Sequence, residues 1–99
     1  MIKIFQINMD RDKKKVKFMP YKFVKRVDFS IYDEIWCGEV PKEYDHIEGI
    51  FEVFNLYHPN DFHGHSLSVS DIVQVVNSDN IESGYYYCDM LGWKKVDIK

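Results

Sequence analysis

Short apolar runs alternate with polar stretches along the chain, and this pattern predicts β-strands on both sides of one helix. The opening run, residues 2–8, alternates in the way that is typical of a strand. A second run, residues 16–24, is apolar and aromatic but contains Pro20, so we expect a strand that is interrupted or lies at a sheet edge. Residues 32–40 predict a third strand, in which Gly38 permits a bulge or bend.

One helical pattern follows, and it begins at Asp45. Asp45 and Glu48 have the spacing of a capping box, and Pro59 should end the helix at His58. Gly49 inside the helix suggests close packing against a sheet. Apolar side chains recur at helical spacing and form one stripe with two marginal members: Ile47, Ile50, Phe51 and Phe54, then Val53 and Tyr57.

After the helix, residues 71–76, 85–89 and 94–99 each predict a strand, and Tyr85 and Tyr87 should share a face opposite to that of Tyr86 and Cys88. The sequence therefore predicts an α+β fold in a single domain, residues 1–99. We expect one small antiparallel or mixed sheet of about five strands, in the order β-β-β-α-β-β, with one amphipathic helix packed on one face.

Length and composition favour a soluble globular domain. The 99 residues are 45% hydrophobic, 16% aromatic and 29% charged, which supplies one core and argues against disorder. No apolar run approaches the roughly 20 residues of a membrane-spanning helix, and the opening residues lack the apolar block of a signal peptide. We expect a cytoplasmic protein without membrane contact, in which Cys37 and Cys88 are reduced core residues.

Charge is unevenly distributed along the chain. Residues 11–26 hold eight basic residues and one acid, a net +7, whereas the five basic and 15 acidic residues elsewhere give −10. The basic segment contains aromatic residues and could follow a phosphate backbone or an acidic protein surface. Alternatively, its lysines have no binding role and are simply exposed to solvent at a hairpin tip and on the outer face of a strand. The candidate binding residues are Arg11, Lys13, Lys14, Lys15, Lys17, Tyr21, Lys22, Lys25 and Arg26.

Polar side chains crowd into HPNDFHGHSLSVSDIVQV, residues 58–75. A hydrolase would need Ser66 or Ser68 as nucleophile, with a nearby histidine as base and Asp61 or Asp71 to orient it. A zinc site would draw its ligands from His58, Asp61, His63 and His65. Neither GxSxG nor a familiar zinc spacing is present, and adjacent residues of a strand point to opposite faces. We expect no catalytic residue, metal or cofactor here.

A structural interpretation accounts for more of this stretch. Serines alternate with apolar residues, and continued alternation would place Asp71 on the apolar face, where an unpaired carboxylate is unfavourable. A turn or bulge at Ser70 and Asp71 would relieve this, with the carboxylate or the serine hydroxyl accepting from backbone amides. The expected structural polar cluster consists of His65, Ser66, Ser68, Ser70 and Asp71.

Several stretches resemble the YodL-like domain, a family of small bacterial domains known largely from Firmicutes and their plasmids, phages and conjugative elements. They are HPNDFHGHSLSVSDIVQV with GYYYCDMLGWKKV, IKIFQINMDRD and SIYDEIWCGEV. Segments 64–73 and 86–96 are the most specific, although Trp93 replaces an expected phenylalanine. The resemblance implies a mobile-element setting and no established catalytic residues.

Two classes of function follow from these features. The first is a non-enzymatic protein-binding module of a mobile genetic element, in its sharpest form an inhibitor of a host CRISPR-Cas or restriction nuclease. Its partner would be a protein of the host or of the element. The alternative is a nucleic-acid-binding accessory domain that uses residues 11–26 and binds in a salt-dependent way. A metal-dependent or Ser/His hydrolase at residues 58–71 is a third hypothesis.

Overall fold

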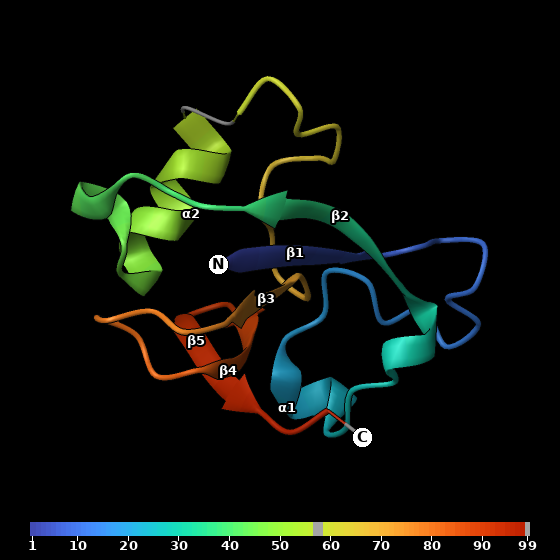
Figure 1. Cartoon of the computed structure of the whole chain (residues 1–99). Helices are drawn as coiled ribbons and strands as arrows, with labels where there is room; N and C mark the ends of the chain where they lie inside the picture. The colour runs from blue at the N-terminus through green and yellow to red at the C-terminus, as the bar shows by residue number, and fades with distance from the viewer. Residues whose placement is uncertain (57–58, 99) are drawn as a thin grey trace.

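In the computed structural model, which describes residues 1–56 and 59–98, five strands form one antiparallel sheet (Figure 1). The strands lie in the order β2-β1-β3-β4-β5, so β2 and β5 are the edges. Their bounds are Ile2–Ile7 for β1, Tyr32–Gly38 for β2, Ile72–Val75 for β3, Gly84–Asp89 for β4 and Gly92–Val96 for β5. The prediction of an α+β fold with a single five-stranded sheet is confirmed.

The predicted strand over residues 16–24 is wrong. This segment contains a loop and then the short helix α1, Tyr21–Val24, and it is followed by a 3-10 turn η1, Phe29–Ile31. Phe18 has a φ of 70°, outside the extended region, and Pro20 has a φ of −64° at the N-cap of α1. Proline fixes φ near this value and suits the start of a helical turn. Two strands, β1 and β2, precede α2, and the three strands indicated over 71–76, 85–89 and 94–99 follow it as β3, β4 and β5. The predicted order β-β-β-α-β-β is therefore wrong.

The longer helix, α2, spans Ile47–Leu56 and follows a 3-10 turn η2, Lys42–Tyr44. The predicted capping box is wrong, because His46 caps the helix instead. Its Nδ1 accepts from the Gly49 amide at 3.0 Å, while the Asp45 carboxylate accepts from the Ser78 hydroxyl at 3.0 Å. Gly49 is closely packed, but against the turn before the helix and not against the sheet as predicted. A Cβ added at Gly49 would lie 2.7 Å from the Tyr44 carbonyl oxygen. The predicted end of the helix at His58 lies outside the described residues.

One hydrophobic cluster joins α2 to the sheet. Ile50, Val53 and Phe54 of the helix belong to the same buried cluster as the strand residues Ile2, Ile4, Trp36, Val73 and Val75. The rings of Trp36 and Phe54 meet edge to face with centroids 4.9 Å apart. Phe51, which the spacing places in the apolar stripe, is 40% exposed, and the buried helix face consists of Gly49, Ile50, Val53 and Phe54.

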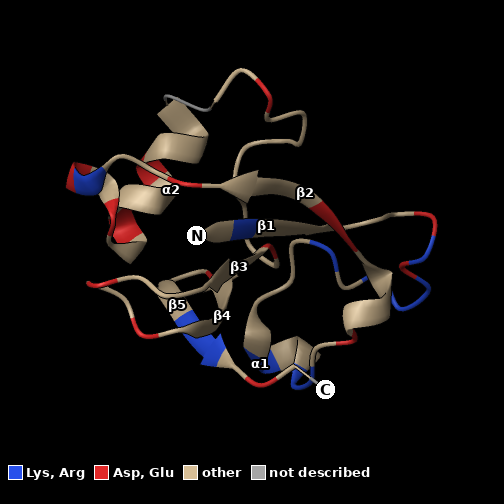
Figure 2. Ribbon diagram, viewed as in Figure 1, with Lys and Arg blue, Asp and Glu red and all other residues tan. Residues whose placement is uncertain are grey.

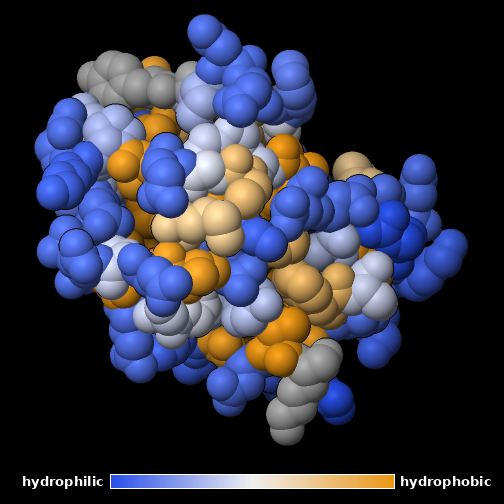
Figure 3. All heavy atoms as spheres, in the orientation of Figure 1, coloured by the Kyte–Doolittle hydropathy of each residue, from blue (hydrophilic) through white to orange (hydrophobic). Residues whose placement is uncertain are grey.

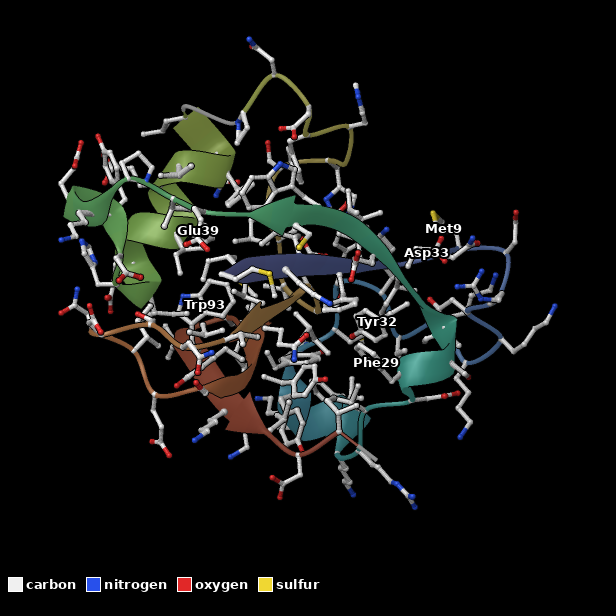
Figure 4. The ribbon with its side chains drawn as sticks, viewed as in Figure 1. Met9, Phe29, Tyr32, Asp33, Glu39 and Trp93 are labelled. Atoms are coloured by element: carbon white, nitrogen blue, oxygen red, sulfur yellow. The ribbon has the colours of Figure 1, made fainter. Side chains whose placement is uncertain are left out.

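A second cluster, on different sheet residues, is covered by α1, by η1 and by the residues between them. Phe5, Ile72, Tyr87 and Val96 form its buried part. Side chains of α1, η1 and the residues between them pack against it: Tyr21, Val24, Val27 and Phe29. Figure 4 shows Phe29 beside Tyr32 at the start of β2, where their rings stack with centroids 5.8 Å apart.

Within β1, Ile4 belongs to the first cluster and Phe5 to the second, and a β-bulge lies between these two residues. Ile4 lies opposite Trp36 but Phe5 lies opposite Glu34, which leaves Ile35 as an extra residue on β2. Tyr85 and Tyr87 contact one cluster and Tyr86 the other, as the alternation predicted. Hydrophobic side chains also reach the surface across the middle of one face (Figure 3). No helix among the described residues is long and apolar enough to cross a bilayer.

Candidate functional site

Asp71 occupies the centre of the polar cluster at the entrance to β3 and is fully buried. Its Oδ2 accepts from the Ser68 amide at 2.8 Å and from the Gln6 side-chain amide at 3.1 Å. The same Gln6 nitrogen donates to the carbonyl of His65 at 2.8 Å, and the His65 Nδ1 lies 3.8 Å from Oδ2. The carboxylate therefore connects β1 with the loop that precedes β3.

Ser70 is the second centre of this cluster, and its φ of 84° places the chain in a turn here, as predicted. Its hydroxyl accepts from the Phe18 amide at 2.9 Å, and its carbonyl accepts from the Tyr32 hydroxyl at 2.6 Å. Its own amide donates to the Cys88 carbonyl at 2.9 Å. Ser70 thus ties the segment before α1, the start of β2 and the end of β4 to one point.

Burial controls the electrostatics of the cluster. It raises the pKa of Asp71 to about 7, against the opposing effects of the Ser68 and Gln6 hydrogen bonds and the charge of Lys17. Burial also raises the pKa of the Cys88 thiol, to about 12, and raises that of the Tyr32 hydroxyl. Within the described part of the chain, Asp71 Oδ1 has no hydrogen-bond partner.

The serine hydroxyls and histidines of the hydrolase hypothesis mostly contact the backbone. His65 Nδ1 lies 2.7 Å from the Ser66 carbonyl oxygen, and the Ser68 hydroxyl donates to the same oxygen at 2.8 Å. Asp61 accepts from the Trp36 indole at 2.8 Å, and His63 is exposed.

The metal hypothesis needs several ligands at one point. Among the residues that the structure describes, no group of three or more His, Cys, Asp and Glu side chains could hold a metal ion. His58 lies outside those residues. Cys37, expected in the core, is exposed because its neighbour Trp36 takes the buried side of β2.

The basic segment does not form one continuous cationic strip. Arg11 pairs with Asp33 and donates to two backbone carbonyls of the η1 and β2 region. Lys17 donates to the Ile7 carbonyl at 2.8 Å, and Lys22 lies over the ring of Phe23. Several of the candidate binding residues therefore have structural contacts.

Four of the candidate residues nonetheless lie at one hollow, and one of them is Arg11, which is paired with Asp33. Lys13 and Lys14 from the loop after β1 and Arg26 from the loop after α1 also line this hollow of about 160 Å³. Lys25 lies with Arg26 at another hollow, beside Asp97. Lys15 is exposed, and Tyr21 packs edge-on against Tyr87 with centroids 5.3 Å apart.

Acidic residues gather at the opposite part of the molecule, around η2 and α2 (Figure 2). Residues 39–52 contain five acids and one lysine. The loop 77–80 joins them, because Asp45 accepts from Ser78, and Asp79 lines a hollow with Glu39 and Asp45. We call this region the acidic end; it consists of Glu39, Glu43, Asp45, Glu48, Glu52 and Asp79.

Sequence reasoning identified Ser70 and Asp71 but missed Gln6, Tyr32 and Asp12. Asp12 is 6% exposed and holds the loop after β1 by accepting from the amides of Val16 and Lys17. A glutamine in a strand whose other residues, apart from Lys3, are apolar was a usable signal for Gln6. Tyr32 and Asp12 gave no comparable signal, since tyrosine is common in strands and aspartate is common in loops.

A comparison with known protein families assigns the chain to one of them. The YodL-like domain model matches residues 1–98, essentially its whole length. The chain belongs to the YodL-like domain family. No curated protein and no solved structure matches it. As a YodL-like domain it combines a buried Ser70–Asp71 cluster with two charged surfaces, and the family assignment itself names no reaction or ligand.

Proposed function

We propose that this YodL-like domain is a non-enzymatic protein-binding module, encoded by a mobile genetic element, whose acidic end binds a cationic groove of a partner. The sharpest form of the proposal is inhibition of a host defence nuclease of the CRISPR-Cas or restriction type. The single observation that supports it is the gathering of carboxylates around η2 and α2. A surface rich in carboxylates resembles a phosphate backbone in charge and can compete with it for a groove that binds nucleic acid.

The state of these carboxylates supports the proposal. Glu43, Glu48 and Glu52 are exposed, and the ion pair of Glu48 with His46 is loose, at 3.8 Å with 82% of the Glu48 side chain exposed. Exposed carboxylates without close cations keep their charge available to a partner. The same charge would repel the phosphates of nucleic acid from this part of the surface.

Affinity capture with two matched triple variants tests the proposal. One variant is Glu43→Gln/Glu48→Gln/Glu52→Gln, and the other is Lys13→Gln/Lys14→Gln/Lys15→Gln, which removes the same number of charges from the basic loop. Tagged wild-type protein should retain a nuclease from a bacterial host lysate, and excess duplex DNA should displace it. The acidic-end variant should lose this nuclease, whereas the basic-loop variant should keep it. Loss in the basic-loop variant alone would contradict the proposal.

A further inference from the structure

The loop between β1 and α1 has a defined shape that presents its lysines outward. The buried Asp12 carboxylate accepts from the Val16 amide at 2.9 Å and from the Lys17 amide at 3.0 Å. Lys15 has a φ of 58°, which turns the chain within this loop. Lys13 and Lys14 are exposed. Their ammonium groups are therefore carried by a loop that is held from inside.

Arg26 reaches the same place from a different part of the sequence. Together with Lys13 and Lys14 it lines the hollow of about 160 Å³ between this loop and the chain that leads from α1 to β2. Hydrogen bonds from Ser30 lower the pKa of Asp28 at the rim, and the charges of Lys14 and Arg26 lower it further. Cations from both segments thus act on one carboxylate at this hollow.

The acids and the remaining cation of the hollow have other partners. Asp12 accepts from two backbone amides, and Asp28 accepts from the Ser30 hydroxyl at 2.6 Å and its amide at 3.1 Å. Arg11 is paired with Asp33. By contrast, Lys13, Lys14 and Arg26 have no ion pair with any described carboxylate. They are the donors left for a ligand.

We propose that this hollow binds a phosphate group, with Lys13, Lys14 and Arg26 as its charged donors. Arginine and lysine both form charge-assisted hydrogen bonds with phosphate oxygens, and two flexible ammonium groups beside one guanidinium can surround a tetrahedral oxyanion. The hollow has a volume of about 160 Å³, whereas a cavity needs roughly 10–15 Å³ to hold one water molecule, so there is room for more than a single water. The phosphate can come from a nucleic-acid strand or from a small phosphorylated molecule. This site is separate from the acidic end and does not depend on the function proposed above.

Two ligands and two matched double variants test the site. Inorganic phosphate is titrated into ¹⁵N-labelled protein at constant ionic strength, with chloride as the reference anion, and a single-stranded DNA oligonucleotide is titrated by fluorescence anisotropy. The site variant is Lys14→Gln/Arg26→Gln, and the control is Lys42→Gln/Lys94→Gln, which changes the net charge equally at positions outside the hollow. Amide shifts should saturate in the loop after β1 and around η1. The site variant should bind at least about tenfold more weakly, and the control should stay within about twofold of wild type.

The two ligands separate the possible sources of the phosphate. Tighter, salt-dependent binding of the oligonucleotide supports a nucleic-acid strand, and saturation by phosphate alone supports a small molecule; either result requires that the site variant be impaired. The site is rejected if phosphate gives no saturable amide shifts beyond those with chloride and the oligonucleotide gives no saturable change in anisotropy. It is also rejected if both double variants weaken binding equally. The Glu43→Gln/Glu48→Gln/Glu52→Gln variant should bind phosphate like wild type, so failure of this site and failure of the proposed protein-binding function remain distinguishable.

Discussion

Asp71 shows how position changes the chemistry of one residue. Its side chain is fully buried, and one carboxylate oxygen has two donors while the other has none among the described residues. An ionised carboxylate in such a place loses its hydration and recovers only part of the loss. For this reason its pKa rises to about 7, and the protonated form is favoured in the folded protein.

The first prediction concerns the pH dependence of stability. The ordinary pKa of an unfolded aspartate is about 3.9, so the folded state binds the proton more tightly. The stabilisation linked to Asp71 is complete below about pH 4 and is lost as the pH rises through about 7. Asp71→Asn cannot titrate, and its free energy of unfolding should fall less over this range, by on the order of 1 kcal/mol per pH unit.

Urea unfolding of wild type and Asp71→Asn across this pH range measures the difference in slope. His65 Nδ1 lies 3.8 Å from the Asp71 carboxylate, so His65→Gln serves as the control and should leave the Asp71 effect in place. Parallel pH profiles for wild type and Asp71→Asn would show that Asp71 does not change its protonation on folding.

The second prediction separates the two roles of Ser70, its hydroxyl and its backbone conformation. Ser70→Ala leaves the partly buried Phe18 amide without its acceptor and should lower the free energy of unfolding by about 1–3 kcal/mol. Ser70→Gly loses the same acceptor but suits a φ of 84°, so it should be about 1 kcal/mol less harmful than Ser70→Ala. If Ser70→Gly had a lower urea midpoint than Ser70→Ala, the turn conformation would carry no strain.

At the scale of elements, the sequence patterns located segments that contact a core but did not always give their secondary structure. The apolar residues of 16–24 indicated a strand, but the chain uses α1 and its flanks to cover a second sheet face. Apolar residues show that a segment contacts a core and do not show its backbone conformation, and Pro20 was the local signal against a strand. The helix over 47–56 was identified from its spacing. Its cap was not, because Asp45 is used by Ser78, a partner far away in the sequence.

The third prediction is Gly49→Ala in α2. Helix propensity alone would favour alanine by about 1 kcal/mol. The added Cβ would lie 2.7 Å from the Tyr44 backbone oxygen and 2.8 Å from the His46 ring, which caps the helix. We expect a net loss of about 1–3 kcal/mol in the free energy of unfolding, because the clash also disturbs the cap. The exposed Glu52→Ala in the same helix is the control and should change stability by less than about 0.5 kcal/mol. A stabilised Gly49→Ala would contradict the close approach.

For the whole molecule, the order of charged residues along the sequence predicted that basic and acidic residues are separated, but not which of them lie together in the fold. The excess of bases in residues 11–26 is visible in the sequence, yet the approach of Arg26 to Lys13 and Lys14 depends on how α1 and η1 lie against the sheet. The order of strands in the sheet could not be predicted either, because it also depends on contacts between distant segments. β1 pairs with both β2 and β3, a choice made by contacts between segments about 30 and 70 residues apart. Local patterns carry no information about such pairings.

The last prediction tests whether the two hydrophobic clusters form one cooperative unit. Phe29 contacts Phe5 and Tyr85, with ring centroids 4.8 and 5.7 Å apart, and belongs to the cover of the second cluster. Phe29→Ala should cost about 2–4 kcal/mol of stability, since it removes a partly buried aromatic ring. Phe23→Ala, at a position 62% exposed on α1, is the matched control and should cost far less.

Two probes report the two clusters separately during urea unfolding. Trp36 and Trp93 pack in the α2 cluster, so tryptophan fluorescence follows that side, and the methyl NMR signals of Ile72 follow the other. Both clusters share the single sheet, whose neighbouring strands are paired throughout, so a small domain of this size should unfold in one transition. Phe29→Ala should therefore lower both midpoints equally. A shift of the Ile72 midpoint alone would show that the cover over the second face unfolds independently of the α2 cluster.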